Sequence, residues 1–194
     1  VAVPSQDMVL GIYYLTQERP GATGEGMIFK SVNEAILAYE NAAVTLHSRI
    51  KVRITKTMPD GTEMTGIVES TLGRFIFNEI IPQDLGFVKR VDEDGRPTEQ
   101  YFDYEITEVC GKKLLGKIVD RTIKLHNFTI AAEVLDNIKA TGYKFSTRAA
   151  ISISVADMTI PPAKYTLIAE TEQRVVDIED QFKMGFMTED ERYR

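Results

Sequence analysis

The C-terminal stretch YTLIAETEQRVVDIEDQFKMGFMTEDERYR carries a narrow apolar seam at helical spacing. Apolar residues recur there at alternating steps of three and four, and acidic residues fill most of the positions between them. This spacing places the apolar side chains on one stripe of an α-helix, which is the pattern of a coiled coil. The stretch therefore predicts half of a paired helical structure, with a seam formed by Ile168, Thr171, Val175, Ile178 and Phe182.

An apolar tip follows the seam around the turn-like residue Gly185. Side chains of this kind are costly to expose to water, so we expect the tip to bind a partner. The alternative is that the tip packs on the body of the chain itself. The apolar members of the tip are Phe182, Met184, Phe186 and Met187.

The composition indicates a globular protein with one domain, or one domain and an appendage. The chain has 194 residues, of which 43% are hydrophobic and 27% charged, enough for a real core. Its net charge is −6 and its pI is about 5.1, whereas a free-standing nucleic-acid binder usually has a basic face. The balance disfavours such a binder but is compatible with a part of a larger nucleic-acid machine.

Cysteine and histidine are too few for a disulfide framework or a zinc site. Cys110 is the single cysteine, and His47 and His126 are the two histidines. This usage is typical of a reducing cytosol, and we expect no metal site in the chain. No apolar run approaches the roughly 20 residues needed to cross a bilayer. The start VAVPSQDMVL lacks a leader pattern and an initiator Met, so both ends are expected to be cut from a longer chain.

A β-hairpin is predicted in the first half of the sequence. The run SRIKVRITKT alternates basic and apolar residues, which indicates a half-buried strand. A turn is expected at PDGT, residues 59–62, and the returning strand in EMTGIVES. The basic face is formed by Arg49, Lys51 and Arg53, and the apolar face by Ile50, Val52 and Ile54.

Helices are predicted on both sides of this hairpin. One begins in PSQDMVLGIYYLT, capped by Ser5 or Asp7, and another is capped by Ser31 with Glu34 three residues later. TLGRFIFNEII is either a helix or a buried strand. Two helices are expected between 107 and 144, with Asn127 as the cap between them and Gly142 as the stop of the second. The expected fold class is α+β, rich in helix, with a small antiparallel hairpin and one long C-terminal helix.

No self-sufficient active site can be proposed from residue spacing. GATGEGM lacks the Lys-Ser/Thr of a P-loop, so a surface loop is favoured over a phosphate cradle. Two interpretations are open for the basic stripe formed by Arg49, Lys51 and Arg53. It either contacts phosphates or is the ordinary solvent face of a strand. No Ser-His-Asp set, Cys-His pair or paired carboxylates emerge, and no catalytic residue is predicted.

Several strings nevertheless resemble one family, the largest catalytic subunit (β′) of bacterial RNA polymerase. They occur in the order of the family from Pro4 to Tyr193, so the resemblance covers nearly the whole chain. The strings are PSQDMVLGIYYLT, KVRIT, TLGRFIFNEIIP, ATGY with TRAAISISVADMTIP, and QFKMGFMTEDERY. PSQDMVLG and ADMTIP are the most specific of them.

The resemblance implies a place in a DNA-directed RNA polymerase, a nucleotidyltransferase. In the family this segment follows the NADFDGD loop, whose aspartates hold the catalytic Mg²⁺. It then forms the wall of the secondary channel, through which nucleoside triphosphates enter and the RNA 3′ end is extruded, and continues into the first arm of an antiparallel helical hairpin at the rim. Residues 1–160 would be the pore module and 161–194 the arm and tip, with the second arm after Arg194. The chain alone would be inactive and without a cofactor, with Mg²⁺ present in the intact enzyme.

The resemblance also implies binding residues and partners. Ser5, Gln6 and Asp7 would lie close to the active centre, with Gln6 positioning a substrate or the RNA 3′ end. Transcript-cleavage factors would dock at the tip, formed by Phe182, Met184, Gly185, Phe186, Met187 and Glu189. Other implied partners are the β, α and ω subunits, the rest of β′, and DNA, RNA and nucleotides in the intact enzyme only. No membrane is implied, and the location would be the bacterial cytoplasm, associated with the nucleoid.

Two alternatives remain open at this stage. The periodicity alone fits a free-standing coiled-coil adaptor that dimerises through the seam at 168–182. A small nucleotide-dependent enzyme built on the glycine loop is the third hypothesis, and it predicts that the isolated chain binds nucleotide.

Overall fold

A computed structural model describes residues 3–57, 61–93 and 96–194. Contacts within the chain divide it into two compact units, Val1–Ile151 (the first unit) and Ser152–Arg194 (the second unit). The expected division at residue 160 concerns roles in a larger assembly rather than contacts, and it stays a prediction.

A three-stranded sheet forms one side of the first unit. Its central strand β2 (Arg49–Thr57) pairs antiparallel with β3 (Glu63–Thr71) and parallel with the two-residue strand β1 (Ile28–Phe29). The predicted hairpin and its alternation are confirmed, since Ile50 and Val52 are fully buried while Arg49 and Arg53 are exposed. The turn expected at 59–62 falls largely on residues outside the described ranges. Strand β1 was not predicted.

Five helices of the first unit were located by the structure: α1 (Asp7–Thr16), α2 (Val32–Glu40), α3 (Leu72–Glu79), α4 (Lys112–Leu125) and α5 (Phe128–Ala149). Two predicted caps are confirmed. The Ser31 hydroxyl accepts the Glu34 N–H at 3.3 Å, and the Asn127 side chain accepts the Ile130 N–H at 2.9 Å. TLGRFIFNEII proves to be helical, because it forms α3.

Two other expectations about helix ends are wrong. Helix α1 begins without any side-chain cap, so neither Ser5 nor Asp7 has that role; the Ser5 carbonyl instead accepts the Met8 N–H at 3.2 Å. Gly142 does not stop α5, which continues to Ala149. A Cβ atom on Gly142 would lie 2.6 Å from the Met8 carbonyl oxygen, and one on Gly11 would lie 1.8 Å from the Gly142 oxygen. These glycines therefore permit the close approach of α1 and α5 rather than a turn.

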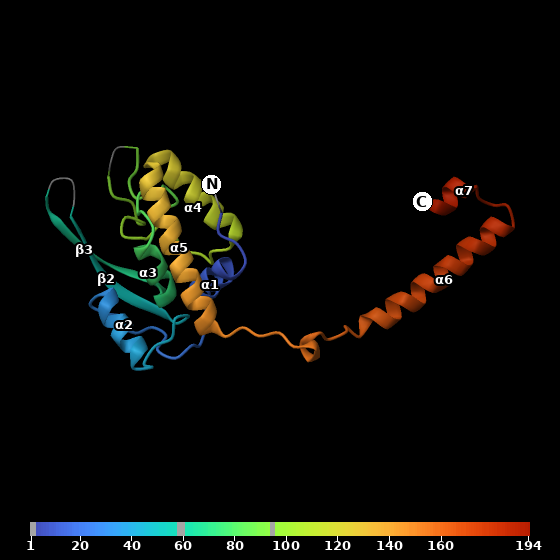
Figure 1. Ribbon diagram of the computed structural model, residues 1–194, viewed down its shortest axis with the longest axis horizontal. Coiled ribbons are helices and arrows are strands. Elements are labelled where there is room, and N and C mark those ends of the chain that lie inside the picture. The colour runs from blue at the N-terminus through green and yellow to red at the C-terminus, as the bar shows by residue number, and fades with distance from the viewer. Residues whose placement is uncertain (1–2, 58–60, 94–95) are drawn as a thin grey trace. The chain divides into compact units, whose positions relative to one another are not determined.

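The helices of the first unit are stacked on the sheet around one core. Figure 1 shows α3 between the long helix α5 and the strands, and contacts link α5 to α1, α1 to α3 and α3 to β3. The largest fully buried side chains come from both the helices and the sheet, and they include Phe75 and Phe77 of α3, Ile12 of α1, Ile50 of β2 and Ile138 of α5.

Buried polar groups fix the long connection between α3 and α4. The Asn78 side chain bonds both the N–H and the carbonyl of Ile106, at 3.0 and 2.8 Å. Arg90 pairs with the fully buried carboxylate of Glu105 at 2.7 Å and also donates to the Gln83 carbonyl. The backbone groups of a chain without regular structure are satisfied here by side chains.

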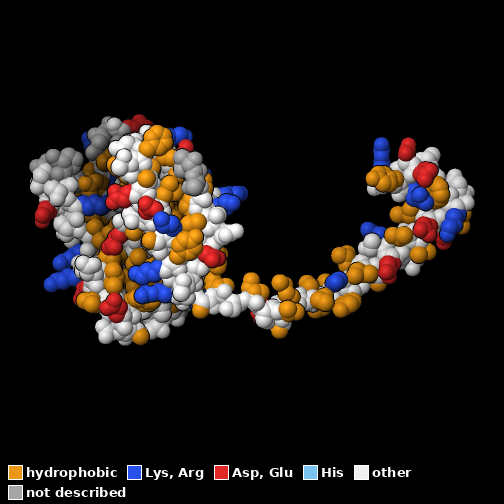
Figure 2. Space-filling view, in the orientation of Figure 1, with side chains coloured by type: hydrophobic (Ala, Val, Ile, Leu, Met, Phe, Trp, Pro, Cys, Tyr) orange, Lys and Arg blue, Asp and Glu red, His pale blue; other side chains and the backbone are white. Residues whose placement is uncertain are grey.

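The second unit contains a short 3₁₀ helix, η1 (Val155–Asp157), then α6 (Ala163–Lys183) and α7 (Glu189–Tyr193). Helix α6 confirms the predicted long helix, and the fold class α+β is confirmed for the chain. None of the side chains of this unit is buried, and only Phe182 and Met187 are partly shielded. Figure 2 shows hydrophobic side chains along its whole length. Within the described residues, no helix combines the length and the apolar character that crossing a bilayer requires.

Candidate functional site

At the turn before α1, Ser5 and Gln6 immediately precede the helix, Asp7 is its first residue, and the backbone of Gln6 has an unusual conformation. Gln6 has φ 49° and ψ −123°, a region that non-glycine residues rarely occupy and that costs on the order of 1–3 kcal/mol. Gln6 and Asp7 are exposed, and Ser5 is partly buried. The Gln6 amide makes no hydrogen bond to any residue in the described ranges. The turn therefore presents a polar side chain from a strained position.

Buried polar contacts hold the other end of α1. The Thr16 hydroxyl donates to the Ile12 carbonyl and accepts the Cys110 N–H, both at 2.8 Å. The Thr16 carbonyl accepts from the buried Arg74 at 2.9 Å, and Arg74 also pairs with Glu18 at 3.1 Å. Burial alone would raise the pKa of Glu18, but the guanidinium groups of Arg49 and Arg74 lower it below its usual range. The turn at Gln6 is thus carried by an anchored helix.

The tip residues lie together in the turn between α6 and α7. Gly185 has φ 77°, and it ends α6 with a Schellman motif, in which the Gly185 N–H donates to the Phe182 carbonyl at 2.9 Å and the Phe186 N–H to the Gln181 carbonyl at 3.0 Å. This conformation favours glycine. The turn leaves Met184 69% and Phe186 76% exposed.

A capping box starts the short helix α7 immediately after the turn. The Thr188 hydroxyl accepts the Glu191 N–H, and the Glu191 carboxylate accepts the Thr188 N–H at 2.8 Å. The hydrogen bonds from the backbone and hydroxyl of Thr188 hold the pKa of Glu191 below its usual range. The Arg192 guanidinium lies 4.5 Å from the centre of the Phe182 ring and 3.5 Å from Glu189. Helix α7 was not predicted from the sequence, and it partly shields Phe182, the last residue of the seam.

The rest of the seam is open in the described residues. Ile168 is 43%, Val175 50% and Ile178 39% exposed. The Thr171 hydroxyl donates to the Leu167 carbonyl of its own helix at 2.7 Å. The apolar stripe predicted from the spacing is present on α6, whereas its pairing with a second long helix stays a prediction.

Most of the basic stripe on β2 is paired with acidic side chains. Arg49 bonds Glu18 at 3.0 Å and Glu69 at 2.9 Å, and Lys51 lies 3.8 Å from Glu69. The hydrogen bond with Glu18, followed by that with Glu69, raises the pKa of Arg49. This pairing favours the reading of the stripe as the ordinary solvent face of a strand.

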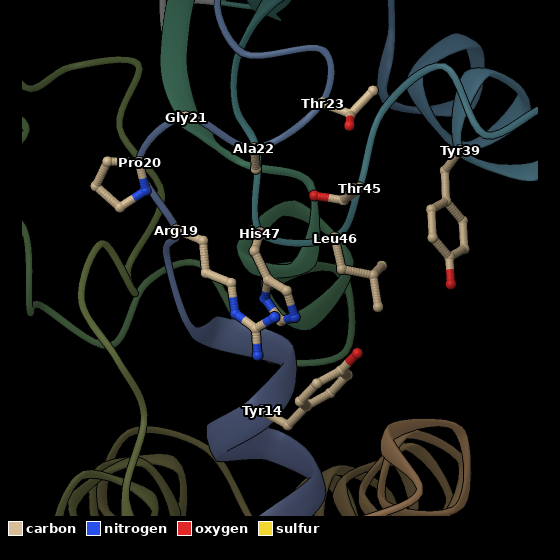
Figure 3. Close-up of a pocket in the computed structure, with 10 residues that line it drawn as sticks. All are labelled: Tyr14, Arg19, Pro20, Gly21, Ala22, Thr23, Tyr39, Thr45, Leu46 and His47. Carbon is tan, nitrogen blue, oxygen red and sulfur yellow. The ribbon is translucent and has the colours of Figure 1, made fainter.

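The glycine-rich loop that follows α1 is closed by one of its own carboxylates. The Gly21 N–H donates to Glu25 at 2.6 Å, so an internal anion occupies the amide that a phosphate would need. This supports the surface loop over the phosphate cradle. The loop does, however, line a pocket of about 570 Å³, together with residues from α1, α2 and the segment before β2 (Figure 3).

His47 lies in the wall of this pocket and His126 lies far along the chain at the surface. The His47 side chain bonds the Gln17 carbonyl through Nδ1 at 3.2 Å and packs edge-on against Tyr14, with ring centres 4.6 Å apart. Burial, and then the charge of Arg19, lowers the pKa of His47 despite the bond to Gln17. His126 lies 2.8 Å from Asp84. Spacing gave no signal for the pocket, because its residues come from four separate segments.

The described residues offer no metal or thiol chemistry. They contain no group of three or more His, Cys, Asp or Glu side chains that could hold a metal ion. Burial, with a smaller effect of Glu108, raises the pKa of the Cys110 thiol to about 12, so this cysteine stays protonated and unreactive.

Comparison with known proteins identifies the family of the chain. The family described as RNA polymerase Rpb1, domain 3, matches residues 1–158. The chain belongs to this family. Among the DNA-directed RNA polymerase subunits beta′, that of Lachnoclostridium phytofermentans is 55% identical over 194 residues, all of this chain and 15% of that protein. Those of Caldicellulosiruptor saccharolyticus and Acetivibrio thermocellus are 54% and 52% identical over 193 residues, all of this chain and 16% of each protein.

The similarity to β′ subunits confirms the resemblance expected from the sequence strings. The Rpb1 domain 3 match covers the turn at Gln6, the pocket and the sheet, while α6 and the tip lie beyond it and within the matches to β′ subunits. The chain spans 15–16% of the length of these curated relatives.

Proposed function

We propose that the chain is part of the β′ subunit of a bacterial DNA-directed RNA polymerase and contributes to DNA-templated transcription in the cytoplasm, at the nucleoid. The observation that carries this proposal is 55% identity over the whole chain to a protein of that name. The described residues do not form a metal site, so the proposal places the catalytic Mg²⁺ and the nucleotidyl transfer in other parts of the intact enzyme. The β, α and ω subunits and the rest of β′ are its proposed partners.

Within that enzyme, the first unit is proposed to line the secondary channel, where nucleoside triphosphates enter and the RNA 3′ end is extruded. The exposed turn with Ser5, Gln6 and Asp7 would face the active centre. The strained backbone of Gln6 and its unbonded amide support this role. An amide has no proton to transfer at neutral pH, so Gln6 would position a ligand by hydrogen bonds.

The tip is proposed as the docking site for transcript-cleavage factors. Met184 and Phe186 are exposed on either side of Gly185, and acidic residues of α7 follow directly. An apolar centre with charges at its rim is the arrangement expected of a binding hot spot. The Schellman motif and the capping box fix its shape before any partner arrives, which reduces the entropy cost of binding.

The test is Phe186→Asp in the assembled polymerase, assayed for RNA synthesis and for cleavage stimulated by the factor of the same organism. We expect stimulated cleavage at limiting factor to fall about tenfold or more, because loss of a hot spot costs more than about 1.4 kcal/mol. RNA synthesis should be unchanged.

Val176→Asp is the matched control. It also replaces an exposed apolar residue by aspartate, and at 100° per residue Val176 lies about 120° around α6 from the middle of the seam. Equal stimulation of the wild-type and Phe186→Asp enzymes would remove factor docking from the functions of the tip, while the proposed place in the polymerase would stand.

The exposed seam favours a second candidate role, pairing of α6 with another apolar helix, including a second copy of the chain. Half-exposed Val175 and Ile178 on one stripe support it. Sedimentation of the chain at rising concentration tests this role. A mass that stays at 21.8 kDa at every concentration would exclude pairing between copies.

A further inference from the structure

The pocket beside His47 has no role in the functions proposed above. Four segments form it: α1, the loop 19–23, α2 and residues 45–47. Its volume of about 570 Å³ falls within the range of about 300–1,000 Å³ that is usual for small-molecule sites. Figure 3 shows Arg19, His47 and Tyr14 converging on one region of it, with Leu46 and Tyr39 to one side.

His47 supplies an unsatisfied hydrogen-bond acceptor. Its side chain is buried, with an exposed fraction of 4%. Because the Gln17 carbonyl can only accept, Nδ1 carries the proton and Nε2 has a free lone pair. Nε2 is buried and has no hydrogen-bond partner among the described residues. Leaving such a group unpaired costs about 1–3 kcal/mol, and an O–H or N–H group of a ligand would remove this cost.

Arg19 supplies a cation without a counter-ion. Its guanidinium makes no hydrogen bond or ion pair with any residue in the described ranges. The two acidic residues closest to Arg19 in sequence are engaged elsewhere, Glu18 with Arg49 and Arg74, and Glu25 with the Gly21 N–H. A free guanidinium is suited to bind a carboxylate through two parallel hydrogen bonds.

The remaining walls favour an organic, planar ligand with a single negative charge. Tyr14 and Tyr39 present aromatic rings and Leu46 an aliphatic surface (Figure 3), which suit the face or edge of a ring. One cation lies beside the pocket, while the carboxylate of Glu25 is fixed in the adjoining loop. A doubly charged phosphate would be repelled by Glu25, so a carboxylate fits the charge balance better.

We infer that this pocket binds a small aromatic or heterocyclic carboxylate that carries an O–H or N–H group. The carboxylate pairs with Arg19, the donor hydrogen-bonds Nε2 of His47, and the ring lies against Tyr14 and Tyr39. The inference rests on the pocket alone and is independent of the role in the polymerase.

The test uses the 194-residue chain and five probes followed by protein NMR: benzoate, 2-, 3- and 4-hydroxybenzoate, and phenyl phosphate. Benzoate lacks the donor, the three isomers vary its distance from the carboxylate, and phenyl phosphate changes the anion. We expect at least one hydroxybenzoate to bind tenfold or more tightly than benzoate and phenyl phosphate, with shifts of the Tyr14, Tyr39 and His47 ring signals.

Three variants separate the two contacts. Arg19→Gln should weaken the best hydroxybenzoate tenfold or more, and His47→Phe should abolish its advantage over benzoate. Arg53→Gln removes an exposed arginine of β2 outside this pocket and should leave the affinity unchanged. No binding to the folded wild-type chain, equal affinity for benzoate and all three isomers, or full affinity in Arg19→Gln would each overturn the inference. Tighter binding of phenyl phosphate would overturn the choice of anion.

Discussion

The two units of this chain differ in where their apolar side chains lie. Every buried hydrophobic residue identified belongs to the first unit, whereas Ile153, Val155 and Phe186 of the second unit are between 75% and 91% exposed. The first unit is stabilised by its own core. Helix α6 has 21 residues and no buried side chain, although most of the stability of a helix in a protein usually comes from packing of its apolar face. Within the second unit, the observed stabilising features include the two capping boxes and the Schellman motif, but no core.

The largest loss of stability should follow from removing a large side chain from the core of the first unit. Phe75 is fully buried in α3, and its ring packs edge-on against Tyr104 at 5.6 Å. Phe75→Ala should lower the free energy of unfolding by about 3–5 kcal/mol, through lost burial and the cavity left behind. Urea denaturation followed by circular dichroism and tyrosine fluorescence measures it.

Ile153→Ala is the counterpart in the second unit, where the side chain is 75% exposed. It should change the free energy of unfolding by less than about 0.5 kcal/mol. A loss of stability comparable with that of Phe75→Ala would contradict the difference between the two units, because it would mean that Ile153 is buried in the folded chain.

A smaller loss of stability is expected from a substitution at the contact between α1 and α5. Gly142→Ala should destabilise the chain by about 1–3 kcal/mol, because its Cβ would collide with the Met8 carbonyl 2.6 Å away and both helices would have to shift. The same urea titration measures the change.

Gly116→Ala is the matched control, and it should change the free energy of unfolding in the opposite direction. Gly116 lies within α4, and a Cβ there meets nothing within 4 Å. Replacement should stabilise the chain by about 0.5–1 kcal/mol through helix propensity alone. If both variants were stabilising, the close packing of α1 on α5 would be refuted.

The smallest predicted effect is a dependence of stability on pH, and it is confined to the first unit. Burial lowers the pKa of His47 below its ordinary value of 6.5, so between the two values the unfolded chain binds the proton and the folded chain does not. The stability contribution is complete above pH 6.5 and declines as the pH falls through 6.5, by less than about 1.4 kcal/mol per pH unit. Urea titrations between pH 7.5 and 5.5 measure this slope.

His47→Gln is the control, because it removes only the His47 imidazole and leaves every other ionisable side chain in place. The decline should be shallower in the variant. The second unit contains no histidine, so the NMR signals of α6 should not change over this range. An identical slope in the wild type and the variant would contradict the assigned direction of the His47 shift.

Local patterns predicted the elements that local chemistry determines. The sequence predicted the alternation in β2 and the caps at Ser31 and Asn127. Each of these features depends on residues within a few positions of one another. Strand β1 was missed, since two residues have no periodicity and pair with β2 only through tertiary contact. Gly142 was misread for a related reason, because the Met8 carbonyl that demands a glycine is distant in sequence.

The candidate sites also differ in how far neighbouring residues in the sequence predict them. The tip was predictable from the apolar residues around Gly185, although the capping box of α7 was overlooked despite its Thr188 and Glu191 signature. The pocket was invisible, because Arg19 and His47 become neighbours only through the fold. The strained backbone of Gln6 likewise has no counterpart in the residue pattern.

The glycine contact between α1 and α5 also restricts how these helices can slide. A helix has 3.6 residues per turn, so sliding α5 by about one turn along α1 would bring Ile138 or Ser146, which share the face of Gly142, toward the place of that glycine. The Met8 carbonyl leaves no room there for even a methyl group. The register between the two helices is therefore locked by sterics, which also fixes the position along α5 of the turn that carries Gln6.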